Sequence, residues 1–186
     1  MRLLTAPLTR EDAESLQLGE LVALSGPILT ARDEVHLRAL KCLDKGQSVP
    51  VALQGAVLYH CGPIMKRTPD GWTVVAAGPT TSARMNALEP RFIRAFGTHA
   101  IIGKGGMSAE VSAAMHEQGC VYLAATGGAA VSLAEGLAQV TGIDWEDLGM
   151  AEAVWHFEAQ NFGPLVVAMD SRGHSLYEQV RQGLKY

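Results

Sequence analysis

Long apolar runs and blocks of like charge are both missing from this 186-residue sequence. No window approaches the roughly 18 apolar residues that a membrane-spanning helix needs, and the N-terminal stretch MRLLTAPLTRED lacks the apolar segment of a signal peptide. Charged residues make up 18% of the chain, its formal net charge is −4, and it has no basic stripe of the kind that nucleic-acid-binding proteins carry. These absences predict a soluble, cytoplasmic protein that binds neither membranes nor nucleic acids.

Cysteine is also scarce, since Cys42, Cys61 and Cys120 are the three in the chain and no two of them form a CxxC pair. An odd, scattered set argues against a disulfide framework. The ligands of an iron–sulfur cluster usually include a close pair, so this spacing favours buried structural thiols over cluster ligands. The histidines likewise lack a metal-ligand spacing such as HxxxH, so no metal site is predicted.

Apolar residues, at 48% of the chain, are sufficient for a sizeable core. We expect a single domain over residues 1–186, with its core at about 21–170. In the centre, strand-like and helical segments alternate, which is typical of βαβ units with parallel strands, and the flanks add further strands. The sequence therefore predicts a layered α/β domain.

The expected strands cover residues 20–25 (ending at Gly26-Pro27), 51–59, 73–77, 100–102, 121–125, 154–159 and 164–170. The expected helices cover residues 32–43, 90–96, 108–118, about 129–139 and about 175–184. Near the N-terminus, Thr9 is expected to cap a further helix together with Asp12.

The first loop with possible chemistry is GPTTSARM, residues 78–85. A helix beginning among its hydroxyl residues, which include Thr81, would present free backbone N–H groups to an anion. Thr80 and Arg84 are four residues apart and would share one helical face, where the guanidinium could hold a carboxylate with two parallel hydrogen bonds. A plain helix cap with a solvated arginine is an equally good interpretation of this segment alone.

The second loop, IGKGGMS over residues 102–108, places Lys104 between glycines at the end of a strand. The phosphate-loop template fails here, because its spacing is wrong and Gly105 replaces the Ser/Thr that would hold magnesium. What remains is a lysine at the carboxyl end of a strand, where α/β sheets tend to bind ligands. The small residues of TGGAA, at 126–130, are most simply a turn.

The third loop, ARDEVHLR over residues 31–38, places Arg32 and His36 four residues apart at a helix start. His36 could transfer a proton near neutral pH. Alone, however, this segment fits better with a surface helix of mixed charge that contains a partly buried histidine.

Together these elements closely resemble the β subunit of class I fumarases and L(+)-tartrate dehydratases. The resemblance rests on ARDxxH (31–36), GPTTxxRM (78–85), GKG (103–105), TGGAA (126–130) and LGMxxAVW (148–155), and it covers about residues 21–170. It departs from the single-chain enzymes at residues 105–107, where those enzymes tend to carry Gly-Asn-Arg-Ser after the lysine.

The resemblance implies a swivelling three-layer β/β/α domain and a heteromer, as a heterodimer or heterotetramer. Its α subunit would carry a [4Fe–4S] cluster for the reversible hydration of fumarate to malate. Arg32, Thr81, Arg84 and Lys104 fall on substrate-binding positions, Thr80 on or near the position of the catalytic base, and His36 on that of an active-site histidine.

Two alternatives to the fumarase subunit stay open. The first is the β subunit of L(+)-tartrate dehydratase, and the second is a non-catalytic module that binds dicarboxylates. Every version requires the guanidinium groups of Arg32 and Arg84 and the ammonium of Lys104 to lie on one face of the molecule.

Overall fold

The computed structural model describes residues 1–69, 71–125 and 130–183. Its strands are β1 (Arg2–Thr5), β2 (Leu21–Thr30), β3 (Val57–Tyr59), β4 (Ile64–Thr68), β5 (Gly71–Ala76), β6 (Ala100–Gly103), β7 (Val121–Ala124), β8 (Leu137–Asp144) and β9 (Val154–Met169). Its α-helices are α1 (Arg10–Ser15), α2 (Asp33–Asp44), α3 (Glu89–Phe96), α4 (Ala109–Gln118), α5 (Ala130–Glu135) and α6 (Leu176–Gly183), and its 3₁₀ turns are η1 (Val51–Leu53), η2 (Ser82–Met85) and η3 (Glu146–Leu148).

Seven strands form a mixed sheet in the order β1-β2-β3-β6-β7-β9-β8, and β4 and β5 form a separate hairpin. The neighbours from β1 to β7 are parallel, whereas β9 runs antiparallel to β7, β8 and β2. Because β9 also pairs with β2, the strand pairings close on themselves through β2, β3, β6, β7 and β9. The predicted central βαβ units are confirmed, since α3 joins β3 to β6 and α4 joins β6 to β7.

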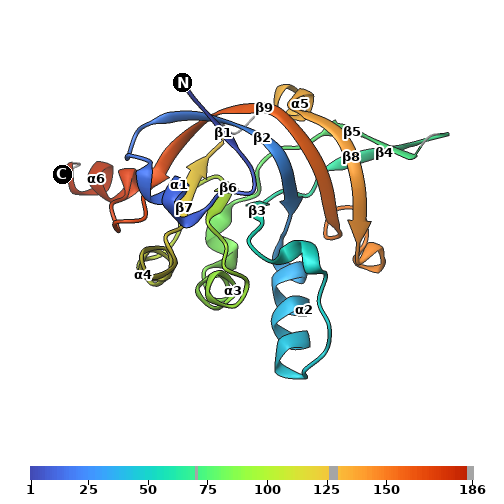
Figure 1. The fold of residues 1–186 in the computed structure, drawn as a ribbon, viewed down its shortest axis with the longest axis horizontal. Coiled ribbons are helices and arrows are strands. Elements are labelled where there is room, and N and C mark those ends of the chain that lie inside the picture. The colour runs from blue at the N-terminus through green and yellow to red at the C-terminus, as the bar shows by residue number, and fades with distance from the viewer. Residues whose placement is uncertain (70, 126–129, 184–186) are drawn as a thin grey trace.

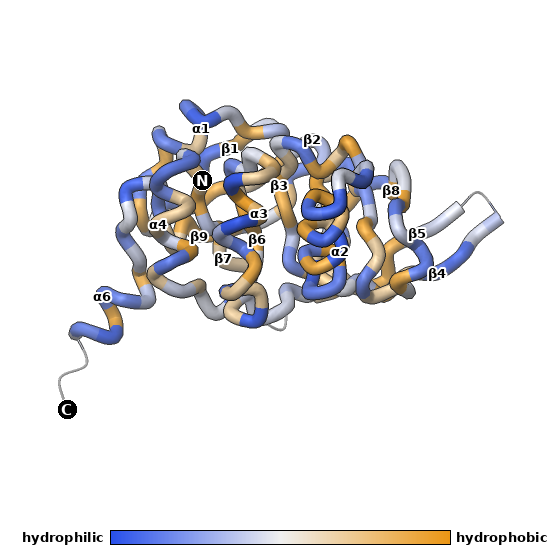
Figure 2. Tube along the Cα trace, turned by 90° about the horizontal axis from the view of Figure 1, so that it is seen from below, coloured by the Kyte–Doolittle hydropathy of each residue, from blue (hydrophilic) through white to orange (hydrophobic). Residues whose placement is uncertain are grey.

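Helices α2, α3 and α4 lie on one side of the sheet, while the β4–β5 hairpin projects at one end of the molecule and α6 at the other (Figure 1). Strands β3, β6 and β7 are almost wholly buried and apolar, as expected for parallel strands covered on both faces. Helix α2 carries hydrophobic and hydrophilic residues side by side, which is visible as mixed colours along its turns (Figure 2); its apolar face packs on the sheet.

The core begins before residue 21. Leu4 in β1 and Leu16 after α1 are buried in the main apolar cluster. The predicted cap of α1 is confirmed, because the Thr9 hydroxyl accepts from the Asp12 backbone N–H at 3.1 Å and Asp12 accepts from the Thr9 N–H at 2.9 Å. Among the described residues no helix is long and apolar enough to cross a bilayer.

The prediction that a strand ends at Gly26-Pro27 was wrong, since β2 continues to Thr30. The register of β2 against β9 shifts between Leu24 and Gly26, so the glycine marks a bulge. Gly26 has a φ of +100°, and a Cβ there would lie 2.6 Å from the Ala6 carbonyl oxygen. The glycine therefore serves close packing inside the strand.

Further along the chain, the helix expected over 129–139 ends at Glu135, and β8 begins at Leu137 by pairing with β9. Gly136 allows this change, because a Cβ there would lie 2.9 Å from the Cα of Phe162. Pairing with a long neighbouring strand has overridden the local helical pattern.

Two further strand predictions also need correction. The segments expected over 154–159 and 164–170 are one strand, β9, which accommodates Asn161 at a φ of 52°. The segment expected over 51–59 is a strand only from Val57, after the η1 turn. The strands β1 and β4 carry no clear sequence signal of their own.

Candidate active site

Arg32 occupies the turn between β2 and α2 and caps the helix. The turn is held by the Ala31 N–H, which donates to the Tyr59 carbonyl at 3.0 Å. The guanidinium lies 3.1 Å from a carboxylate oxygen of Glu152 and 3.5 Å from the Ala151 carbonyl. Only 18% of the side chain is exposed, so these contacts fix its position at the rim of the fold.

Arg84 reaches the same place from a different loop. Its Nε lies 3.2 Å from Oδ1 of Asp33 and its Nη2 lies 3.0 Å from Oδ2. The Nη2 of Arg32 lies 3.9 Å from that same Oδ2, so one carboxylate contacts both guanidinium groups. The structure therefore brings Arg32 and Arg84 together, as the sequence analysis requires.

The loops that carry Thr80 and Lys104 run side by side. Thr81 and Lys104 form a parallel β-bridge, and the Ser82 N–H donates to the Lys104 carbonyl at 3.0 Å. The Thr80 N–H donates to the His60 carbonyl at 2.6 Å, beside β3. Lys104 thus lies next to the residues that lead to Arg84, and among the described residues its ammonium has no ion-pair partner.

The helix expected to begin among the hydroxyl residues 80–82 is a short 3₁₀ turn, η2 (Ser82–Met85), with Thr81 at its N-cap position. Thr80 lies before this turn, so Thr80 and Arg84 do not share a helical face. The preceding backbone is extended because Pro79 bridges to Cys61 and the Thr80 N–H bonds to the neighbouring loop. Arg84 is placed by the turn rather than by a helix.

The charges around the two arginines partly cancel. Arg32 and Arg84 contribute two positive charges, and Asp33 and Glu152 contribute two negative ones. Lys104, on the neighbouring loop, adds a third positive charge. Asp33 and Arg84 are 26% and 52% exposed, so an incoming carboxylate could compete with Asp33 for the Arg84 fork.

His36 lies directly beneath this face but is completely buried. Its Nδ1 contacts the Arg32 carbonyl oxygen at 2.7 Å, and its Nε2 lies 3.1 Å from Oε2 of Glu89. The Nε2 of His60 lies 3.1 Å from the same oxygen, and all three side chains are 0% exposed. The expectation of a proton-transferring His36 at the substrate is not supported by this placement, because its imidazole is enclosed.

The pKa values of this buried group are strongly perturbed. Burial lowers the pKa of His36, but the charge of the Glu89 carboxylate, with hydrogen bonds to Glu89 and to the Arg32 carbonyl, outweighs it and raises that pKa above the ordinary value. Burial also acts to raise the pKa of Glu89, but the two imidazoles hold it well below its usual range. Opposite charges on Glu89 and His36 therefore stabilise one another.

Glu89 and His60 were missed by the sequence analysis. Glu89, immediately before Pro90, resembles the acidic residues that are common in the first turn of helices. His60 has no residue close to it in the sequence that would indicate a shared site. His36, His60 and Glu89 nevertheless offer ligand atoms that lie within 4.8 Å of one another. Only the packing of α2, β3 and α3 brings them together.

The cysteines do not provide the ligand set that an iron–sulfur cluster requires. Cys61 and Cys120 are buried in different apolar clusters and Cys42 lies on α2. Burial raises the pKa of Cys61 to about 12 and keeps the pKa of Cys120 well above its ordinary value, so neither is a ready thiolate. Within the described residues, no cysteine belongs to a group of potential metal ligands.

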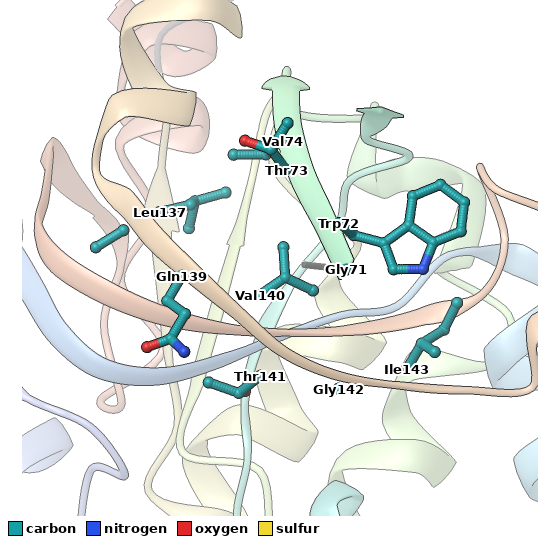
Figure 3. Close-up of a pocket in the computed structure, with 11 residues that line it drawn as sticks. Gly71, Trp72, Thr73, Val74, Leu137, Gln139, Val140, Thr141, Gly142 and Ile143 are labelled. Carbon is teal, nitrogen blue, oxygen red and sulfur yellow. The ribbon is translucent and has the colours of Figure 1, made fainter. Parts of the chain in front are cut away.

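Two cavities lie away from the arginines. One, of about 340 Å³, opens between β5 and β8, where Trp72, Val74, Leu137, Val140 and Ile143 surround it (Figure 3). The other, of about 350 Å³, adjoins the loop after Lys104. Neither is lined by Arg32, Arg84 or Lys104. The candidate site therefore lies outside these two cavities.

The small-residue stretch 126–130 is described only at Ala130, and residues 126–129 lie outside the described part of the chain. The Ala130 carbonyl accepts from the Ala77 N–H at 2.9 Å, and a Cβ at Gly78 would lie 3.0 Å from the Ala130 side chain. This contact places the start of α5 against the GPTT loop.

Comparisons with known proteins give the same family that the sequence motifs resemble. The family described as fumarase C-terminus matches residues 2–180. A Methanocaldococcus jannaschii protein provisionally named L(+)-tartrate dehydratase subunit β is 48% identical over 176 residues, which cover 94% of this chain and 90% of that one. The L(+)-tartrate dehydratase subunit β of Escherichia coli K12 is 33% identical over 180 residues, covering 94% and 86%.

A longer relative shows the same segment within a single chain. A Geobacillus stearothermophilus protein provisionally named fumarate hydratase class I is 41% identical over 180 residues, which cover 96% of this chain but 34% of the relative. The family match over nearly the whole chain and these relatives show that this chain belongs to the fumarase C-terminus family, as a β-type domain of class I fumarate hydratases and L(+)-tartrate dehydratases.

Proposed function

We propose that this chain is the β subunit of an iron–sulfur hydro-lyase and binds a four-carbon dicarboxylate. The proposal rests on one observation. Arg32 and Arg84 come from separate loops and contact the same carboxylate, that of Asp33, and the loop that carries Lys104 lies alongside. This cationic face, formed by Arg32, Arg84 and Lys104, offers positive charges to a dianion. Such charges stabilise the negative charge that builds on a carboxylate when a neighbouring carbon loses its proton.

In this proposal each cationic residue has a distinct role. Arg84 grips one substrate carboxylate with its fork, after Asp33 gives way. Arg32 and Lys104 neutralise the remaining charge, and Thr81 lines the same loop. Thr80 stands where a proton would be taken from carbon, although a threonine hydroxyl needs activation by a neighbour to act as a base.

We further propose that the cluster belongs to a partner α subunit, since Cys61 and Cys120 are buried in different apolar clusters and Cys42 lies apart from them on α2. The relatives named as β subunits support a two-chain enzyme. The open cationic face fits a domain that closes over a site on its partner, and a swivelling three-layer arrangement would supply that motion. As a soluble partner of a soluble enzyme, the chain would act in the cytoplasm.

Two reactions fit this site. Hydration of fumarate to malate is the reaction we propose first, in line with the fumarate hydratase relative. Dehydration of tartrate to oxaloacetate is the second candidate, because the relatives of matching length, at 90% and 86% coverage, are named as tartrate dehydratase subunits. Both remove or add water across two adjacent carbons that carry carboxylates, so both need the same cationic face.

Activity with and without the α subunit tests the proposal. The chain alone, the cluster-loaded α subunit alone and the assembled complex are assayed for loss of fumarate absorbance and for oxaloacetate formed from tartrate. We expect turnover of one substrate by the complex alone. A complex that turns over neither substrate would contradict the proposal. A stable monomer that binds dicarboxylates without turnover would instead support the non-catalytic module.

A further inference from the structure

A buried ionic cluster lies beneath the proposed site, and the proposed function assigns no role to it. Oε2 of Glu89 lies 3.1 Å from the Nε2 of His36 and 3.1 Å from the Nε2 of His60, and none of the three side chains is exposed. Both contacts are short polar contacts with one carboxylate oxygen.

The partners of each ring define the protonation state. Nδ1 of His36 faces the Arg32 carbonyl, which can only accept, and its Nε2 faces a carboxylate, so His36 carries a proton on both nitrogens. The Tyr122 hydroxyl donates to Ser82 Oγ at 2.9 Å, and the Ser82 hydroxyl is then free to donate to Nδ1 of His60 at 2.9 Å. This leaves His60 neutral, with its proton on the nitrogen that faces Glu89.

The cluster is attached to the backbone of each loop that forms the cationic face. His36 contacts the Arg32 carbonyl. The His60 carbonyl accepts from the Thr80 N–H, and the His60 ring contacts Ser82. The Ser82 N–H in turn donates to the Lys104 carbonyl. A shift of Glu89 would therefore be transmitted to Arg32, Thr80 and Lys104 at once.

A buried ion pair is a poor source of stability, because removing its charges from water offsets most of the attraction between them. Replacing such a group by well-packed apolar residues often leaves a protein as stable as before. Stability alone therefore does not explain the cluster. Its contacts with the loops of Arg32, Thr80 and Lys104 indicate another role, because a binding site must hold its side chains in place to a fraction of an ångström.

We propose that Glu89, His36 and His60 form a positioning cluster that sets the relative placement of the Arg32, Thr80 and Lys104 loops. The inference rests on the proposed function and deepens it. The three residues act through the backbone they hold and do not touch the substrate. The geometry does not point to a structural zinc site, because closed zinc sites take four protein ligands and three potential ligands converge here within the described residues.

Three variants of the assembled enzyme test the cluster. In Glu89→Gln the amide nitrogen, in the place of Oε2, can donate to Nε2 of both imidazoles once each is neutral with its proton on Nδ1, so kcat/KM should stay within about threefold of wild type. Glu89→Leu leaves both imidazoles without a partner and should lower kcat/KM by about tenfold or more, with a raised KM for the dicarboxylate. The triple variant His36→Leu, His60→Phe, Glu89→Met should fold and assemble, yet lose activity to a similar extent.

Glu117→Gln, at an exposed ion pair with Arg94, is the matched control and should leave activity unchanged. Rates are expressed per folded, assembled molecule, with folding followed by circular dichroism. Wild-type kinetics in the triple variant would overturn the positioning role. A stoichiometric divalent metal other than cluster iron, lost in Glu89→Gln, would also overturn it. Absence of activity in the wild-type complex would instead count against the proposed function.

Discussion

Replacing Arg84 by lysine should damage catalysis while leaving the fold intact. In the structure the guanidinium contacts Asp33 through two nitrogens, at 3.2 and 3.0 Å, which is the fork geometry we propose for a substrate carboxylate. A lysine ammonium keeps the charge but loses one of the two directed bonds. A hydrogen bond to a charged group contributes about 1.5–3 kcal/mol, so kcat/KM should fall roughly 10- to 100-fold.

The assay is steady-state hydro-lyase kinetics on the α–β complex. Arg91→Lys is the matched control, because Arg91 contacts Asp44 through two nitrogens and is 54% exposed, against 52% for Arg84. The control should keep wild-type kinetics, and both variants should unfold at nearly the wild-type temperature since exposed ion pairs add little stability. Wild-type kcat/KM in Arg84→Lys would remove this residue from the site.

The remaining predictions concern stability and thiol chemistry. His36 keeps its proton above its ordinary pKa of 6.5 and Glu89 stays ionised below its ordinary pKa of 4.5, so the excess stability of wild type over Glu89→Gln should shrink as pH rises above 6.5, by up to about 1.4 kcal/mol per pH unit; urea titrations with a gap that does not change above pH 6.5 would contradict the ion pair. Thiol reagent should label one cysteine, the half-buried Cys42, in the folded chain and all three after unfolding, and rapid labelling of all three in the native chain would refute the burial. Gly26→Ala should destabilise the chain by about 1–3 kcal/mol in thermal unfolding, because its Cβ would meet the Ala6 carbonyl; an unchanged melting temperature would count against that contact.

The sequence motifs predicted which loops form the candidate site, but they did not predict the geometry of those loops. Arg84 and Lys104 were proposed from loops rich in glycine and proline that follow strands, and Arg32 from its spacing to His36 at a helix start. The meeting of Arg32 and Arg84 depends on Asp33, whose carboxylate contacts both guanidinium groups. That contact joins residues far apart in the chain and could not be read from local spacing.

The same limit explains the buried cluster. Nothing around Glu89 distinguishes it from the acidic residues common at helix starts, and only the docking of α3 against α2 and β3 places it between His36 and His60. For the fold, alternating periodicity identified the central βαβ units. It failed at two glycines in close tertiary contact: β2 continues through Gly26, where an end was expected, and the helix ends just before Gly136, where it was expected to continue.

The most direct test of the cationic face is a crystal structure of the assembled α–β enzyme with an unreactive dicarboxylate such as succinate. The account predicts a carboxylate within about 3.2 Å of the Arg84 guanidinium, with Arg32 and the Lys104 ammonium around the same ligand and Asp33 released from the Arg84 fork. A dicarboxylate held entirely by α-subunit residues, with Arg84 still paired to Asp33, would contradict it.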